Sequence, residues 1–426
     1  MSLHRERTGR RRAAVAAWLS SALLAAGAGG AAAQRSASPA GGEWRGGGPT
    51  LTAFDGGFRL APVLRLDVDA ASFFGQDRPG GFRSGANLRR ARVGAEGGVG
   101  DAFEYSFIWD FGGSDPNDWG AIYEAQVAYT GLGWGTVRLG AFKLRHLPEF
   151  SGSSFDLPFL ERAAISNLAA SVASGDTRVA LGFEARGERW VGSLYVTDGV
   201  LSERNDGGQR GVAGRLAVLA VDRPGAQLQL GFNGAWRFET GGRGRASFGD
   251  YPELRVDSRR FLDTGPLRAE AAHAVGPEVT AQLGPLVLEA VWQSLGVDAP
   301  GADGGADGGA DRRFEGWYVQ GVHPLLGPGR RRDSRTGVWA RPEVSGGSPD
   351  PAAGRFGALE IAGRYSTADL RDGSTRGGRQ RVWSAAFNWF PRNDLRITAQ
   401  YANGTIDLDG RDRDFQAVGL RIAFNL

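Results

Sequence analysis

The sequence predicts an all-β fold, a transmembrane antiparallel β-barrel with sixteen strands. Three observations lead to this prediction. Apolar and polar residues alternate with a period of two over many segments. Short and long connections alternate between those segments, and the chain starts with what reads as an export signal. After that signal no run of about 20 apolar residues follows, which a membrane-spanning helix would need.

Residues 1–33 have the layout of a secretory signal peptide. A charged start, MSLHRERTGRRR, precedes the apolar run AAVAAWLSSALLAAGAGG and an A-x-A cleavage pattern at Ala31–Ala33. We therefore expect export, an N-terminal periplasmic segment over 34–57 and a barrel over 58–426. The signal holds five arginines and one glutamate, so its removal takes the net charge from +3 to near −1. The basic pI then gives no support for a nucleic-acid partner.

The alternation is clearest in the first expected strand, FRLAPVLRLDVDA, where Leu64, Leu66 and Val68 alternate with Arg65 and Asp67. A strand with one apolar and one polar face can separate lipid from a water-filled lumen. The same pattern predicts strands at 58–70, 87–97, 102–112, 121–130, 135–144, 178–186, 189–197, 211–219, 226–236, 274–283, 285–296, 315–323, 355–366, 380–390, 394–403 and 415–426.

The connections between these strands differ in length in a regular way, which favours an outer-membrane barrel with short periplasmic turns and long extracellular loops. The short ones include 98–101, 130–135, 186–189 and 391–394. The long ones include 71–86, 145–177, 237–273, 297–313 and 367–379. One segment, 324–354, is long where a short turn is due.

No catalytic, cofactor or metal site is expected. Outside the signal, His146, His273 and His323 stand singly, without the spacing of metal ligands. Motifs for a nucleophile elbow, a phosphate-binding loop or paired cysteines are missing from the sequence. We therefore do not expect an enzyme.

Arginines on the polar faces suggest passage of anions, because a guanidinium is permanently charged and fits oxyanions. Those with the inward parity are Arg59, Arg65, Arg90, Arg92, Arg138, Arg186, Arg364, Arg396 and Arg421. Arg89 has the opposite parity, and we expect it at the extracellular rim. The alternative is a lumen of mixed charge, in which these arginines pair with Asp67, Asp69, Glu96 and Asp110; parity does not separate the two.

Several motifs together resemble the phosphate-selective porin O and P family. They are FRLAPVLRLDVDA, LRRARVGAEG, YEAQVAYTGL, VRLGAFKL, FLERA, YPELRVDSRRFLDTG, RDSRTGVWARPE, GALEIAGRYS and VGLRIAFNL. The resemblance implies a homotrimer of 16-stranded barrels in the outer membrane, with the third loop, 145–177, folded inward as a constriction loop. By motif position it implies anion-binding or pore-lining roles for Arg65, Arg89, Arg90, Arg162, Ser153 and Ser154. Parity adds weaker pore-lining candidates: Arg59, Arg92 and Arg138.

Two positions depart from the family pattern, since Phe150 replaces a constriction lysine and Tyr123 replaces an aspartate. We therefore expect a water-filled, anion-preferring diffusion channel in the outer-membrane lipid, whose partners are small inorganic anions such as phosphate or polyphosphate. A general or organic-anion porin without phosphate selectivity is one alternative. A plugged structural or adhesive barrel is the other.

Overall fold

The architecture is given by a computed structural model of the chain. The residues that it describes are 50–113, 120–173, 175, 177–199, 208–242, 244–300, 310–344 and 354–426. The expected signal peptide and the first part of the expected periplasmic segment lie outside these residues.

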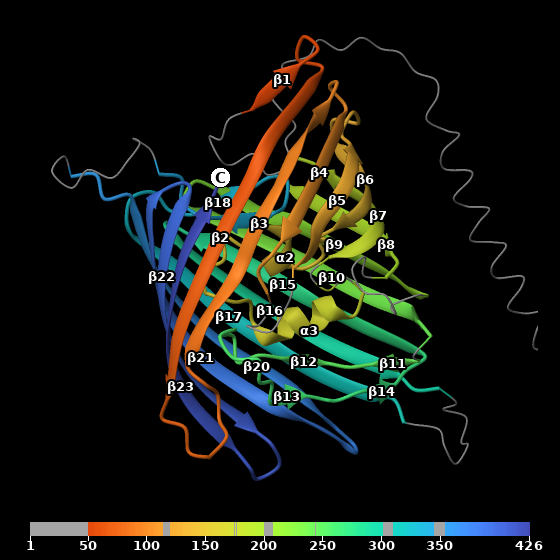
Figure 1. Cartoon of the computed structure of the whole chain (residues 1–426), viewed down its shortest axis with the longest axis vertical. Helices are drawn as coiled ribbons and strands as arrows, with labels where there is room; N and C mark the ends of the chain where they lie inside the picture. The colour runs from red at the N-terminus through yellow and green to blue at the C-terminus, as the bar shows by residue number, and fades with distance from the viewer. Residues whose placement is uncertain are drawn as a thin grey trace, which may run out of the picture. The chain divides into compact units, whose positions relative to one another are not determined.

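Sixteen antiparallel strands form one closed barrel, as the sequence predicts (Figure 1). Consecutive strands pair with each other, and the first strand, β2, pairs with the last, β23, which closes the sheet. The strands are β2 (Phe58–Phe74), β3 (Gly85–Val99), β4 (Phe103–Asp110), β5 (Ala121–Tyr129), β6 (Gly135–Phe142), β7 (Arg178–Arg186), β8 (Trp190–Thr197), β9 (Gln209–Arg223), β10 (Ala226–Thr240), β15 (Ala271–Leu283), β16 (Leu286–Asp298), β17 (Arg312–Leu326), β20 (Ala358–Asp372), β21 (Thr375–Arg392), β22 (Leu395–Asp407) and β23 (Arg413–Asn425).

The two faces of the barrel wall differ in polarity as the alternation predicts. On β2, the side chains of Leu64 and Leu66 are 42% and 43% exposed, whereas Arg65 and Asp67 between them are buried. The exposed face is therefore apolar and the buried face polar, the reverse of a soluble barrel. This is the arrangement that lipid outside and polar groups inside require.

Two local expectations about connections change. The connection expected at 367–379 is a tight turn, because β20 and β21 continue to the pair Asp372 and Thr375. Arg371 stabilises this extension with hydrogen bonds to Asp369 and, on the next hairpin, Asp407. In addition, β1 (Leu51–Ala53) pairs with the start of β2, so the expected periplasmic segment ends in a short strand.

The long connection between β17 and β20 carries a small hairpin of its own, β18 (Arg331–Asp333) and β19 (Val338–Ala340). It is held against buried side chains of the barrel wall. Arg215 of β9 and Gln229 of β10 donate hydrogen bonds to the Gly337 carbonyl at 3.3 and 2.7 Å. Arg330 forms an ion pair with Glu360 of β20 at 2.6 Å. The sequence shows the unusual length of this segment but not these contacts.

The connection between β6 and β7 contains two helices, α2 (Pro148–Ser151) and α3 (Ala164–Ser171). In Figure 1, α3 lies beside the short strand β12 (Gly249–Asp250), and it contacts β15, β16, β17 and β20. Ile165 and Leu168 of α3 share an apolar core with Phe248 and with the buried side chains Leu295 and Tyr318 of the wall. None of the helices among the described residues has the length and hydropathy to cross a membrane.

Candidate functional site

A β-bulge in β3 turns two consecutive arginines to the same side. Arg90 pairs with Asp67 of β2 while Leu88 pairs with Val68, so Arg89 is an extra residue between them. A bulge of this kind inserts one residue and redirects its side chain. Both Arg89 and Arg90 are therefore buried, while Leu88 is exposed. The outward parity expected for Arg89 is wrong, because strict alternation does not hold across the bulge.

Arg89 points to a carboxylate of the connection between β6 and β7. Its Nε and Nη2 atoms donate to the two oxygens of Glu161 at 2.7 and 3.1 Å. Arg421 of β23 donates to Glu161 at 2.9 Å, and Nε of Arg255 lies 3.4 Å from it. Burial raises the pKa of Glu161, but the arginines outweigh this effect and hold it well below its usual range. Glu161 is thus a buried anion among arginines from three parts of the chain.

Two aspartates of β2 complete this arginine–carboxylate network. Asp67 accepts two hydrogen bonds from Arg65, at 3.0 and 2.9 Å, and one from Arg90 at 2.8 Å. Asp69 accepts two from Arg421, both at 2.6 Å. Arg255 also contacts Asp250 at 3.3 Å. The network has the members Arg65, Arg89, Arg90, Arg255, Arg421, Asp67, Asp69, Glu161 and Asp250.

Arg92, the third arginine on β3, belongs to a separate pair. Its Nε donates to Asp110 of β4 at 2.7 Å. Its guanidinium lies 3.3 Å from the centre of the Tyr123 ring. The interpretation as a lumen of mixed charge therefore gains support here, because three of its four expected acids, Asp67, Asp69 and Asp110, do pair with arginines.

The second position that departs from the family pattern also carries a ring against an arginine. The Arg162 guanidinium lies 3.9 Å from the centre of the Phe150 ring, and its Nε donates to the Glu149 carbonyl at 2.9 Å. The neighbouring predicted residues Ser153 and Ser154 have different roles. The Ser153 hydroxyl accepts the Phe155 N–H at 3.2 Å, while the Ser154 hydroxyl is buried without a hydrogen-bond partner among the described residues.

A third aromatic ring, Phe155, is surrounded by arginines. The guanidinium carbons of Arg65, Arg341 and Arg396 lie 5.5, 5.0 and 5.5 Å from its centre. Arg396 is fully buried, donates only to backbone carbonyls of Phe155 and Leu157, and leaves its Nε and Nη2 without partners in the described part of the chain. These arginines come from β2, β22 and the connection after β19, so the ring joins distant segments.

Glu149 at the start of α2 belongs to a group of buried acids around Arg364. Arg364 donates to Glu149 at 3.4 Å and to Glu253 at 2.5 Å. Burial raises the pKa of Glu149 to about 7, although the charge of Arg364 opposes this. Glu253 also accepts the first N–H of α3, from Ala164, and so ties that helix to the segment before β13 (Leu262–Asp263).

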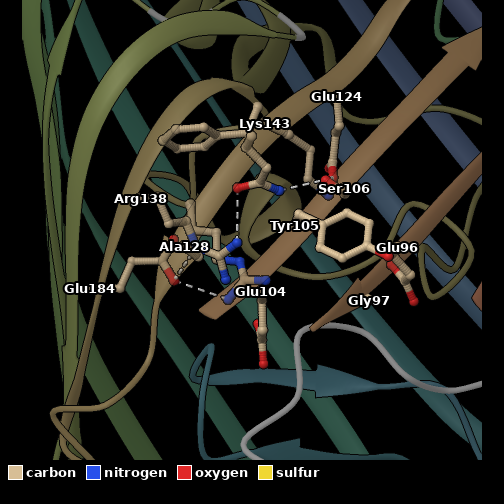
Figure 2. A pocket seen from close by; sticks show the side chains of 13 residues that line it. Glu96, Gly97, Glu104, Tyr105, Ser106, Glu124, Ala128, Arg138, Lys143 and Glu184 are labelled. Atoms are coloured by element: carbon tan, nitrogen blue, oxygen red, sulfur yellow. Dashed lines mark hydrogen bonds and ion pairs between the residues drawn. The ribbon is translucent and has the colours of Figure 1, made fainter. Parts of the chain in front are cut away.

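A partly open cavity lies along the inner faces of β3 to β7 (Figure 2). In Figure 2 Arg138 faces Glu184, at 3.3 Å, and Glu124 accepts a hydrogen bond from Ser106. The other charged residues of the lining are Glu96, Glu104, Lys143 and Arg145. The predicted pore-lining residue Arg138 thus belongs to a region in which acids and bases are mixed.

The predicted residues are therefore only partly brought together. Arg65, Arg89 and Arg90 meet in the network, whereas Arg162 contacts α2. Arg59 is at the opposite end of its strand and donates to the Gly100 carbonyl at 3.2 Å. Sequence reasoning missed Glu161 and Arg255, although both stand in the quoted motifs FLERA and YPELRVDSRR. No metal-binding group of three or more His, Asp or Glu occurs in the described ranges.

Comparison with known proteins identifies the family. The family model for the phosphate-selective porin O and P matches residues 63–426. The chain belongs to this family. A curated relative, an uncharacterised protein of Caulobacter vibrioides, is 27% identical over 408 residues, which cover 89% of this chain and 76% of that protein.

Solved structures of outer-membrane proteins share the fold of this porin O and P family member. OmpT of Vibrio cholerae has a TM-score of 0.53 at 9% identity and covers 89% of this chain and 100% of its own. The anion-selective porin from Comamonas acidovorans has a TM-score of 0.53 at 14% identity, with coverages of 86% and 100%. Family and fold together indicate an outer-membrane porin, a channel rather than an enzyme.

Proposed function

We propose that the chain forms a water-filled diffusion channel that prefers anions. The observation that carries this proposal is the charge balance of the buried face. The arginine–carboxylate network contains five arginines and four carboxylates, and Arg396 beside it adds a sixth guanidinium. A surplus of fixed positive charge in a narrow lumen favours anions over cations.

The segment 145–177 is proposed as the constriction loop of this channel. Its residues meet buried side chains on several strands of the wall. Glu161 bonds to Arg89 of β3 and Arg421 of β23, while the Pro158 carbonyl accepts a hydrogen bond from Asn388 of β21. A loop that forms hydrogen bonds with several wall strands can keep the width of the pore constant. The homotrimer expected from the family stays part of the proposal.

Phosphate selectivity is the finer question, and Arg162 is the residue to test. Single-channel current in planar bilayers should fall as phosphate is added to wild type. Arg162→Ala should need about tenfold more phosphate for the same block, because a hydrogen bond to a charged group contributes about 1.5 kcal/mol or more.

The matched control is Arg376→Ala, at an exposed hairpin tip where the side chain is 73% exposed and pairs with Asp409. Phosphate should block the current of this variant at the same concentration as in wild type. Equal block in Arg162→Ala and wild type would remove Arg162 from the anion path. A wild-type channel that prefers cations would refute the anion preference, and absence of conductance would favour a plugged barrel.

A second candidate function, passage of organic anions, is favoured by three of the rings that contact arginines. Phe150, Tyr123 and Phe155 each lie within 5.5 Å of a guanidinium carbon. Such pairs suit anions that also carry an apolar body, because the ring covers that body while the guanidinium meets its charge. Benzoate blocking the current at lower concentration than phosphate would support this candidate.

A further inference from the structure

The Glu161 carboxylate occupies a position that has the features of an oxyanion site. Both its oxygens accept hydrogen bonds from Arg89, in the two-point geometry with which arginine binds carboxylate or phosphate. Arg421 and Arg255 approach from other segments at 2.9 and 3.4 Å. The side chain of Glu161 is 1% exposed, so these contacts are shielded from water.

The other carboxylates of the network belong to the wall or to another connection, whereas Glu161 is brought in by the segment 145–177. Asp67 and Asp69 are on β2, and Asp250 is on β12. Glu161 therefore supplies a negative charge to the wall arginines Arg89 and Arg421 from a part of the chain that is not a barrel strand. With it, the network has a surplus of one positive charge; without it, the surplus would be two.

We infer that Glu161 is a built-in counter-ion that limits the anion selectivity of the pore, by occupying guanidinium groups that would otherwise act on permeating anions. This inference rests on the proposed function, because it concerns the same channel. Its consequence is that the number of arginines overstates the positive potential of the lumen.

The variant Glu161→Gln tests this inference through the reversal potential of the open channel in a KCl gradient. A unit charge that acts on an ion across about 8 Å of water contributes about 0.5 kcal/mol, so loss of the Glu161 charge should ease chloride entry and hinder potassium entry by roughly twofold each. The ratio of chloride to potassium permeability should therefore rise about fourfold. If Glu161 only anchors its segment, the pore should widen instead, with higher conductance and a ratio that is unchanged or lower, which would overturn the inference.

A second pair of variants keeps the test valid if Glu161→Gln does not fold. Arg89→Gln and the double variant Arg89→Gln/Glu161→Gln differ only in the charge of residue 161. The double variant leaves fewer unpaired arginines than Glu161→Gln alone, because Arg89 is also replaced. The ratio should again be about fourfold higher in the double variant than in Arg89→Gln, by the same estimate. Equal ratios would overturn the inference.

Glu239→Gln is the matched control for a change in total charge, because Glu239 is exposed on β10 and pairs with Arg210 at 4.0 Å. Its ratio should equal that of wild type; a rise as large as that of Glu161→Gln would overturn the claim that the position matters. A cation-preferring wild type would refute the proposed function alone, since the direction of the change at Glu161 would still be measured.

Discussion

Deletion of Arg89 should leave the barrel intact, since it removes the one residue that interrupts the alternation of β3. After the deletion, Asn87, Arg90 and Arg92 keep the buried side and Leu88 and Ala91 the opposite side, with the pairing to β2 unchanged. The cost is the two-point contact between Arg89 and Glu161, about 1.5–3 kcal/mol for hydrogen bonds between charged groups.

Deletion of Ala91, two residues further, is the matched control. It also removes one residue and thus the bulge, but it leaves Arg89 and Arg92 on the buried side and turns Arg90 toward lipid. An arginine on the lipid face costs about 2–4 kcal/mol at the middle of the bilayer and less near its surfaces. The Ala91 deletion should therefore be the less stable of the two by up to that amount.

The assay is unfolding in urea of each variant after refolding into lipid vesicles, followed by tryptophan fluorescence, with heat-modifiable migration on gels to verify the folded barrel. Wild type should be the most stable and the Ala91 deletion the least. If both deletions are equally stable, or the Arg89 deletion does not fold, the extra residue in β3 is not Arg89 and the bulge assignment is refuted.

The remaining predictions concern the helix α2. Glu149 has its pKa raised to about 7 by burial, so it favours the protonated form in the folded protein, and its contribution to stability should be lost as pH rises from about 4.5 to 7. Glu149→Gln should therefore reduce the fall in melting temperature over that pH range. The fall should not vanish, because burial raises the pKa of Asp250 to about 6 as well. A pH profile of the melting temperature equal to that of wild type would argue against titration of Glu149. Phe150→Leu should keep most of the apolar volume but remove the ring below Arg162, lowering the free energy of unfolding by about 1–2 kcal/mol. A calorimetric melting temperature equal to that of wild type would show that the ring contributes nothing.

The number of strands could be predicted because the environment of a barrel wall fixes the polarity of every second residue in each strand. Lipid on one side and polar groups on the other force the alternation of Leu64, Arg65, Leu66 and Asp67, and sixteen such segments are visible in the sequence. The ends of the strands could not be predicted equally well. Beyond the lipid the alternation weakens, and contacts such as Arg371 with Asp407 decide how far a hairpin extends.

The candidate site could be predicted only as a set of arginines. Parity identifies Arg65, Arg90 and Arg421 as residues of the polar face, and all three are buried there. Parity fails at Arg89, since a bulge adds a residue without changing the pattern on either side. Parity also does not identify the partners of these arginines. Glu161 lies in a connection between strands, where residues do not alternate and the sequence pattern does not predict the course of the chain.

The pairing of charges, more than their number, determines what a pore of this kind can select. The network contains Arg65, Arg89 and Arg90 at neighbouring positions of two strands, yet each contacts a carboxylate within 3.1 Å. A paired guanidinium still orients hydrogen bonds, but its field on a distant ion is largely cancelled by its partner. Selectivity must then depend on the arginines that have no carboxylate partner. Arg396 is one of them, since no carboxylate among the described residues is in hydrogen-bond contact with it. An arginine count from sequence is thus an upper limit to the positive potential, and the difference is set by segments such as 145–177 that bring acids to the wall.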